Sequence, residues 1–315
     1  MILDDASVPS GPFRRIWLLE DRMYSRRDLA KIALGAFSAG RLLGKPSSTI
    51  RGVTLGVHTR SFRDSTLEDA LAAIAKVGIG TCELWEGHVA PPRLSRKGLR
   101  EWRETIAIEQ FQLVASSASK VGVKIHAYNY EFAEDFSDLE TQRGFEMAKA
   151  LGAGVVTASP PPAMIRALNA AAGKTGLLVG LRNGDGKQPG DLSNADELLA
   201  TIRGNSNTGI CLDALAFAAA GNDVAKFLVS HLDRTLAVGL RDHGERVAFG
   251  QNNALAAAVL RQVQGRRATY PVVIDYDSQG PDPFAVVDRA FSFCKQILTA
   301  KYIPPPAPVA PARKT

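Results

Sequence analysis

The chain has 315 residues, of which 45% are hydrophobic and 22% are charged, a composition typical of a globular protein with a full core. This length accommodates one α/β barrel or two smaller domains. The formal net charge of +6 arises mainly from residues 1–45, which hold eight Lys or Arg and five Asp or Glu, and from Arg313 and Lys314. Residues 46–312 are nearly neutral, with 28 basic and 27 acidic side chains. The charge therefore gives no case for nucleic-acid binding.

Three cysteines, Cys82, Cys211 and Cys294, lie far apart in apolar runs. They form neither a CxxC metal motif nor a disulfide framework. Their surroundings predict buried, unreactive thiols.

The N-terminal region contains Ser25-Arg26-Arg27 shortly before the weakly apolar stretch Ile32–Gly40. A twin arginine before a short apolar segment is typical of a bacterial Tat export signal. The apolar stretch is too short for a membrane span, which needs about 20 apolar residues. We therefore predict that residues 1–47 form a signal or unstructured segment, with no stable membrane span, and that the protein is periplasmic or secreted. An amphipathic surface helix is the alternative.

Replacing Arg26 and Arg27 together with Lys is expected to abolish export, because the Tat signal is defined by this arginine pair. The measurement is the share of the protein that reaches the periplasm of a bacterial host. Unchanged delivery of the double variant would contradict the prediction.

Between the two ends, eight short β-branched runs alternate with longer Ala- and Leu-rich segments. The predicted strands are, in chain order, Thr54–His58, Gly80–Trp85, Val123–Tyr128, Val155–Ser159, Leu177–Leu181, Gly209–Asp213, Thr235–Leu240 and Val272–Tyr276. A helical pattern follows each run. Leu67–Val77, for example, has apolar residues at helical spacing after a Ser65/Thr66 cap.

This alternation predicts a parallel sheet with right-handed crossovers. Eight units favour a single (β/α)₈ barrel over residues 50–300, and an open doubly wound sheet is the alternative. No G-x-G-x-x-G motif follows the first strand, which disfavours a dinucleotide-binding sheet. The Pro-rich residues 303–315 are predicted to form a polyproline-like tail.

Polar side chains gather at the predicted strand ends, where barrel enzymes place their active sites. They are His58 and Arg60; Glu83, Glu86 and His88; His126, Tyr128 and Asn129; Thr157 and Ser159; Arg182, Asn183 and Asp185; Asp213; Arg241, Asp242 and His243; and Asp275 and Asp277. The sequence therefore predicts a polar pocket at the C-terminal end of the barrel.

Several segments resemble a known family. They are Gly56–Phe62, Cys82–His88, Ala127–Tyr130, Gly144–Gly152 and Phe249–Gln251. In order and spacing, over about residues 52–300, they are similar to secreted sugar phosphate isomerase/epimerase proteins with a xylose isomerase-like barrel. The resemblance implies proton transfer next to a carbonyl of a carbohydrate. It also implies one divalent metal, held at the ends of strands five to eight by a Glu or His, an Asp, a His and a Glu.

The sequence departs from that ligand set at two of four positions. Arg182 stands at the first ligand position and Gly239 at the His position, whereas Asp213 keeps its acid and Asp275 replaces Glu. Guanidinium cannot become a metal ligand near neutral pH. We therefore expect no metal, or one divalent ion such as Mg²⁺ or Mn²⁺ weakly bound by Asp213 and Asp275 in a degenerate site.

The predicted catalytic residues are Glu83, Asp213 and Asp275. Glu83 is either a general base or an acceptor of hydrogen bonds from a buried neighbour. The predicted ligand contacts are His58, Trp85, His88, Arg182, Arg241 and Asp242. Arg182 is expected to pair with Asp213 or Asp275 and to take the electrostatic role of the metal.

Two functions from different classes stay open. One is an isomerase or epimerase acting on a small-molecule carbohydrate, and the other is a metal-free, non-catalytic barrel that binds a carbohydrate or a protein. A related metal-cluster endonuclease is disfavoured because the five histidines are scattered and residues 46–312 are nearly neutral. The oligomeric state is not predicted.

Overall fold

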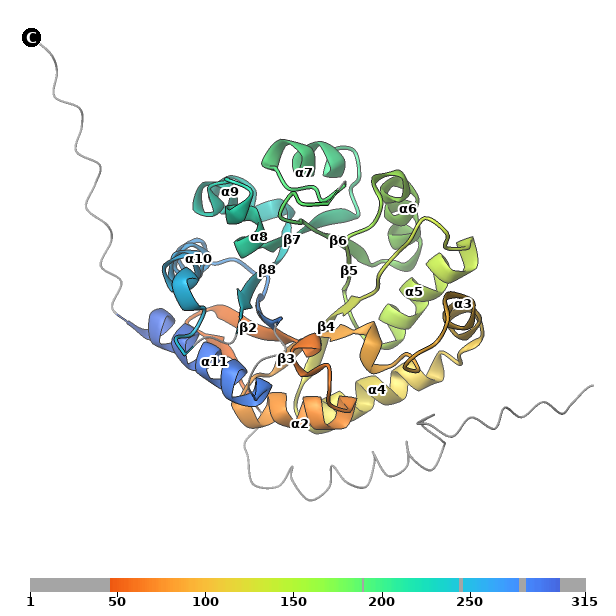
Figure 1. Cartoon of the computed structure of the whole chain (residues 1–315), viewed down its shortest axis with the longest axis horizontal. Coiled ribbons are helices and arrows are strands. Elements are labelled where there is room, and N and C mark those ends of the chain that lie inside the picture. The colour runs from red at the N-terminus through yellow and green to blue at the C-terminus, as the bar shows by residue number, and fades with distance from the viewer. Residues whose placement is uncertain (1–45, 189, 244–245, 278–281, 301–315) are drawn as a thin grey trace, which may run out of the picture.

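Eight parallel strands form a closed ring in the computed structural model, which describes residues 46–188, 190–243, 246–277 and 282–300. The predicted export signal and the Pro-rich tail fall almost entirely outside these residues. From β2 to β9 each strand pairs with the next, and β9 pairs with β2 through Leu55 and Val272, which closes the ring. Figure 1 looks down this ring and shows the helices outside the strands. The predicted (β/α)₈ barrel is confirmed, because an open sheet lacks the closing pair.

The strands are β1 (Thr49–Ile50), β2 (Val53–His58), β3 (Thr81–Trp85), β4 (Lys124–Asn129), β5 (Val155–Ala158), β6 (Leu178–Arg182), β7 (Thr208–Asp213), β8 (Thr235–Asp242) and β9 (Val272–Tyr276). The α-helices are α2 (Leu67–Val77), α3 (Arg96–Thr105), α4 (Glu109–Lys120), α5 (Asp138–Ala150), α6 (Ile165–Thr175), α7 (Ala195–Ile202), α8 (Ala214–Ala219), α9 (Val224–Ser230), α10 (Asn253–Arg266) and α11 (Pro283–Thr299). Five 3₁₀ turns join them: η1 (Thr59–Phe62), η2 (Glu86–His88), η3 (Pro162–Met164), η4 (Leu232–Arg234) and η5 (Gly250–Asn252).

All eight predicted strands are present, with ends that differ by a few residues. The helix predicted over Leu67–Val77 begins and ends at those residues. Its start is capped by Thr66, whose hydroxyl accepts a hydrogen bond from the Asp69 amide at 3.1 Å. Its end is Gly78, whose φ of 96° is the left-handed conformation that glycine adopts without strain.

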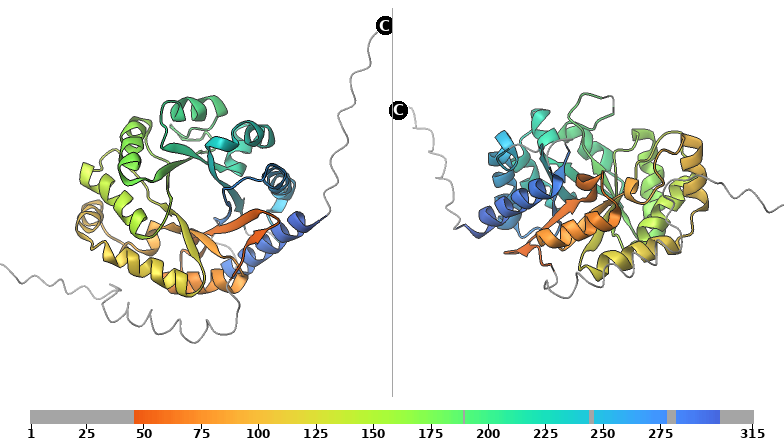
Figure 2. Two further views of the ribbon diagram at one scale, coloured as in Figure 1. Left: turned by 180° about the vertical axis from the view of Figure 1, so that it is seen from behind. Right: turned by 60° about the horizontal axis from the view of Figure 1, so that its bottom comes forward.

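The main hydrophobic core lies between the ring of strands and the surrounding helices. Figure 2 shows the same arrangement from behind and tilted. A smaller apolar cluster of Cys211, Ala237 and Val273 lies on β7, β8 and β9. Because side chains alternate between the two faces of a strand, Asp213, Arg241 and Asp275, two residues beyond Cys211, Gly239 and Val273, lie on the same face further towards the strand ends. We call this C-terminal end of the barrel the mouth.

All three cysteines are buried free thiols, as predicted. Burial raises the pKa of Cys82 to about 12, and it raises the pKa values of Cys211 and Cys294 further. None of the helices in the described residues combines the length and apolar composition needed to cross a membrane.

Candidate functional site

Five charged residues predicted to meet at the mouth line one small cavity of about 20 Å³. They are Glu83 on β3, Arg182 on β6, Asp213 on β7, Arg241 on β8 and Asp275 on β9. The prediction that they converge is confirmed. Their convergence follows from the closed ring, because all parallel strands of a barrel end at the same rim.

Arg182 lies between two carboxylates. Its Nη2 donates to Oε1 of Glu83 at 2.5 Å, and its Nη1 lies 3.9 Å from Oδ2 of Asp275. The sequence had predicted Asp213 or Asp275 as partners of Arg182, so Asp275 is confirmed as the more distant contact. Glu83, the main partner, was not predicted. Glu83 also accepts a hydrogen bond from the Thr157 hydroxyl.

Asp213 instead pairs with Arg241, which comes from the neighbouring strand. The other guanidinium nitrogen of Arg241 lies 3.3 Å from Oδ2 of Asp277. Asp213 also begins helix α8, where its Oδ1 accepts a hydrogen bond from the Ala216 amide at 3.0 Å. Both carboxylate oxygens of Asp213 are therefore engaged within the protein.

Asp275 is surrounded by cationic or ionisable groups. Nδ1 of His58 lies 3.4 Å from its Oδ1, and Nη2 of Arg60 lies 3.5 Å from its Oδ2. Arg60 also approaches Asp277, which accepts a hydrogen bond from Arg63 at 2.9 Å. Acids and guanidinium groups thus alternate around the mouth, which balances their charges.

Several buried polar atoms of this ring have no hydrogen-bond partner within the protein. They are the Nε atoms of Arg60, Arg182 and Arg241, both ring nitrogens of His58, and Oδ1 of Asp275. Native proteins satisfy most buried polar atoms, so a cluster of unsatisfied atoms at one site indicates a binding site.

The acids of the ring are held in their ionised form. Burial by itself would raise the pKa of Glu83, but Arg182, His58 and the Thr157 hydroxyl lower that pKa to about 2. Burial likewise opposes ionisation of Asp275, and His58, Arg182 and Arg60 outweigh it and lower its pKa further. Both groups are therefore carboxylates at neutral pH, able to accept a proton.

A wider cavity of about 590 Å³ adjoins the ring at Arg182, which lines both cavities. The loops after β4, β5 and β6 form its walls, with Phe132, Ser159 and Asp191 among the lining residues. This volume lies within the usual range of 300–1,000 Å³ for small-ligand pockets. The ring therefore has an open approach large enough for a monosaccharide.

Two predicted ligand contacts are instead occupied within the protein. Both ring nitrogens of His88 are engaged, Nδ1 with the Thr59 hydroxyl at 3.0 Å and Nε2 with the Phe62 carbonyl at 3.1 Å. Burial lowers the pKa of His88 to about 4, so it stays neutral at pH 7. Asp242 is fully buried and accepts a hydrogen bond from the Phe249 amide at 3.0 Å. The prediction of a sugar contact is wrong for these two residues, because a strand end can point into the protein as well as into the mouth.

Trp85, a third predicted contact, is half-buried and packs edge-to-face with His88, with 5.5 Å between ring centroids. It lines neither cavity of the mouth. His58, by contrast, lies in the ring beside Asp275.

The residues present do not fit a divalent metal. In the described ranges, no three His, Cys, Asp or Glu side chains are grouped so that they could hold an ion. Asp213 and Asp275, the two predicted ligands, each face a guanidinium group. Arg182 adds fixed positive charge beside them and has no lone pair to offer.

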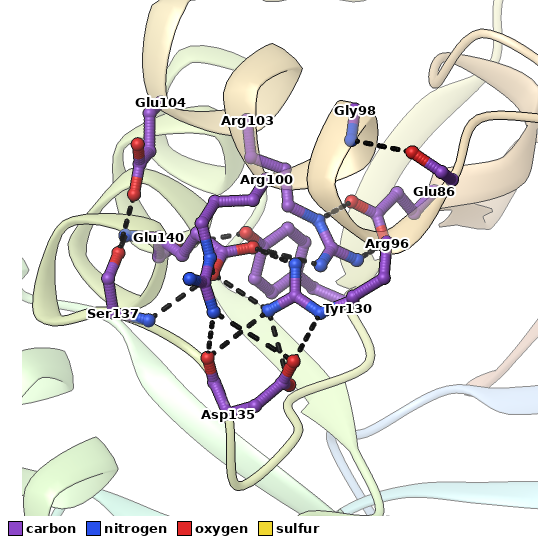
Figure 3. A network of polar contacts seen from close by, with 11 residues as sticks. Glu86, Arg96, Gly98, Arg100, Arg103, Glu104, Tyr130, Asp135, Ser137 and Glu140 are labelled. Carbon is purple, nitrogen blue, oxygen red and sulfur yellow. Dashed lines mark hydrogen bonds and ion pairs between the residues drawn. The ribbon is translucent and has the colours of Figure 1, made fainter.

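A second polar network, missed by the sequence analysis, lies outside the ring (Figure 3). Arg103 is buried and bonds Glu86 through two parallel hydrogen bonds of 2.8 and 2.7 Å. It also lies 3.4 Å from Glu140, which accepts further hydrogen bonds from Arg96 and Arg100. The 3–4 residue spacing of the three arginines on α3 places them on one helix face and could have revealed them.

This network ties the mouth to its outer helices. Glu86 follows β3 directly, and Arg96 also bonds Asp135, which lines the wider cavity. The Arg103 guanidinium stacks on the rings of Tyr130 and Phe136, 4.8 and 4.5 Å from their centroids. The network therefore fixes one wall of the approach to the ring.

Comparison with solved structures identifies barrels of the same fold. A sugar phosphate isomerase/epimerase from Parabacteroides distasonis is 13% identical, with a TM-score of 0.57, over 81% of this chain and 98% of its own. A 3-keto-D-glucoside 4-epimerase from E. coli is 13% identical, with a TM-score of 0.58, over 78% and 99%. The IOLI protein, solved with a zinc atom, is 15% identical, with a TM-score of 0.54, over 78% and 96%.

No protein-family model matches the chain, and no curated protein matches it. The fold and the site together define a (β/α)₈ barrel with a charged mouth. Its structural neighbours include xylose isomerase-like sugar isomerases and epimerases. At these identities the likeness establishes the fold, and the substrate and any metal must be argued from the residues.

Proposed function

We propose that the mouth binds a small carbohydrate with a carbonyl group and moves a proton on a carbon next to that carbonyl. The observation that supports this most is the ring itself, where two buried carboxylates, Glu83 and Asp275, flank the guanidinium of Arg182. Unsatisfied polar atoms in the same ring await partners, and the wider cavity gives a sugar access.

The proposed step uses the protein's own groups. One carboxylate removes a proton from the carbon next to the carbonyl, and the electron pair passes to the carbonyl oxygen to form an enediolate. The proton then returns to the same carbon from its other face, which gives an epimer, or to the neighbouring carbon, which gives an isomer. Glu83 and Asp275 lie near different nitrogens of one guanidinium, so a carbon bound beside Arg182 has a proton acceptor on two sides.

Export to the periplasm or beyond is part of this proposal. It rests on the twin arginine before the apolar stretch, which lies outside the described residues.

Deuterium incorporation tests the proposal. The full chain is incubated with D-fructose, D-xylulose or dihydroxyacetone in D₂O, and NMR follows exchange at the carbon next to the carbonyl. Glu83→Gln and Asp275→Asn are each expected to slow exchange by about 100-fold, because each removes a proton carrier. Glu109→Gln on the outer helix α4 is the control and should leave the rate unchanged.

The alternative function gives a different result. The low pKa of Glu83 and the pairing of each acid with a guanidinium group also suit a barrel that binds without turnover. Sugar binding by calorimetry without exchange would favour that alternative. No binding of any of the three ketoses would contradict the proposal.

A further inference from the structure

The small cavity inside the ring has the size of one oxygen atom with its hydrogens. Its volume is about 20 Å³, and a cavity needs about 10–15 Å³ measured in this way to hold one water. Its apolar walls include Cys211, Ala237 and Val273. A whole sugar cannot enter it, but one oxygen atom of a sugar can.

The polar lining of this cavity includes unsatisfied atoms of both kinds. Nε of Arg182 and Nε of Arg241 are buried donors without a partner, and Oδ1 of Asp275 is a buried acceptor without a hydrogen bond. A bound water or hydroxyl typically has two to four polar partners. Two cationic donors and one acceptor would satisfy such an oxygen, and they favour it most when it carries negative charge.

From this geometry we propose that the cavity is a single-oxygen site: Arg182, Arg241 and Asp275 hold one water in the free protein and the ligand's carbonyl oxygen in the complex. This inference rests on the proposed function and names the feature that the ligand must present, an oxygen next to the reacting carbon. During proton removal, the electron pair moves to this oxygen, and the two guanidinium groups stabilise the enediolate. Such fixed donors aimed at developing charge supply a large part of enzymatic rate enhancement.

Gly239 gives a direct way to fill the site. It lines the cavity, and a β-carbon placed there would meet nothing nearer than the Leu212 carbonyl at 3.7 Å and the Asp213 Cα at 3.9 Å. Gly239→Ala therefore fits the barrel without a clash and places a methyl group, close in size to a water, beside the cavity. Gly154→Ala is the matched control, because a β-carbon at Gly154 meets nothing within 4 Å and Gly154 lies outside both cavities.

The test is a set of crystal structures of the full chain, free and soaked with D-fructose, for wild type, Gly239→Ala and Gly154→Ala. We expect one oxygen-sized density peak between Arg182, Arg241 and Asp275 in free wild type and in Gly154→Ala, and none in Gly239→Ala. In the soaked wild type, a sugar oxygen should replace it. Calorimetry should show D-fructose binding about tenfold more weakly to Gly239→Ala, the loss expected for one charge-assisted hydrogen bond.

Other outcomes overturn the inference. These are an empty cavity in wild type, a peak that persists in Gly239→Ala, a divalent metal in the cavity, or a bound sugar that leaves the original water in place. The proposed function fails separately: a peak that behaves as expected without deuterium exchange keeps the oxygen site and removes the catalysis. Exchange with an empty cavity keeps the catalysis and removes the oxygen site.

Discussion

Replacing Arg103 with Met is expected to lower the free energy of unfolding by about 3–5 kcal/mol at neutral pH, because it leaves a buried carboxylate without its ion-pair partner. The Arg103 side chain is 4% exposed and that of Glu86 is 8% exposed. Glu86 loses both hydrogen bonds in the variant, whereas Glu140 keeps those from Arg96 and Arg100. The loss also removes the cationic group that stacks on Tyr130 and Phe136.

The pH dependence of this loss follows from Glu86. Burial already raises the pKa of Glu86 even with Arg103 beside it, and removal of the guanidinium raises that pKa further. A carboxyl group whose pKa is raised by folding favours the folded state most when it is protonated. The destabilisation should therefore be larger at pH 7 than at pH 4, where Glu86 takes up a proton.

Urea denaturation followed by circular dichroism at both pH values measures these differences. Lys187→Met is the control, since Lys187 pairs with Asp185 on the surface, and its removal should cause no measurable change. Equal stability of Arg103→Met and wild type at pH 7 would show that the buried pair contributes nothing to the fold.

Replacing Arg182 with His is expected to convert the mouth from a site that excludes divalent cations into one that binds Mn²⁺. The change removes a fixed positive charge and adds a nitrogen ligand beside two carboxylates, Glu83 and Asp275. Arg182→Met is the matched control, because it removes the guanidinium without adding a ligand. Calorimetry with Mn²⁺ and Mg²⁺ should give Arg182→His an affinity at least about 100-fold above that of wild type, about 2.7 kcal/mol.

A second measurement on the same variants keeps this prediction testable if binding is weak. Loss of Arg182 removes the strongest of the influences that lower the pKa of Glu83, so burial should raise that pKa from about 2 towards or above its ordinary value. The lowered pKa of Glu83 in wild type stabilises the fold above pH 4.5, and this contribution disappears as the pH falls towards 2. In Arg182→Met that dependence should be reduced or reversed. Wild type that purifies with one divalent metal bound through Asp213 and Asp275 would overturn the whole interpretation of Arg182.

The two cavities show which parts of the site were predictable. The sequence placed Glu83, Arg182, Asp213, Arg241 and Asp275 at one rim, and the structure confirms it. The wider cavity was not predictable, because its walls come from loops whose paths have no periodic pattern. The roles assigned to the site residues stay predictions until the variants are measured.

The sequence by itself determined the barrel and the membership of the ring. Eight alternating βα units can close in one way, and closure brings all strand ends to one rim regardless of the details of packing. Only the tertiary structure decided which charges meet. Arg182 reaches Glu83 from β6 to β3, strands that are not neighbours, whereas Asp213 pairs with Arg241 from the adjacent strand. The physical reason is that partner choice depends on side-chain reach and direction across the barrel, which the order of residues along the chain does not specify.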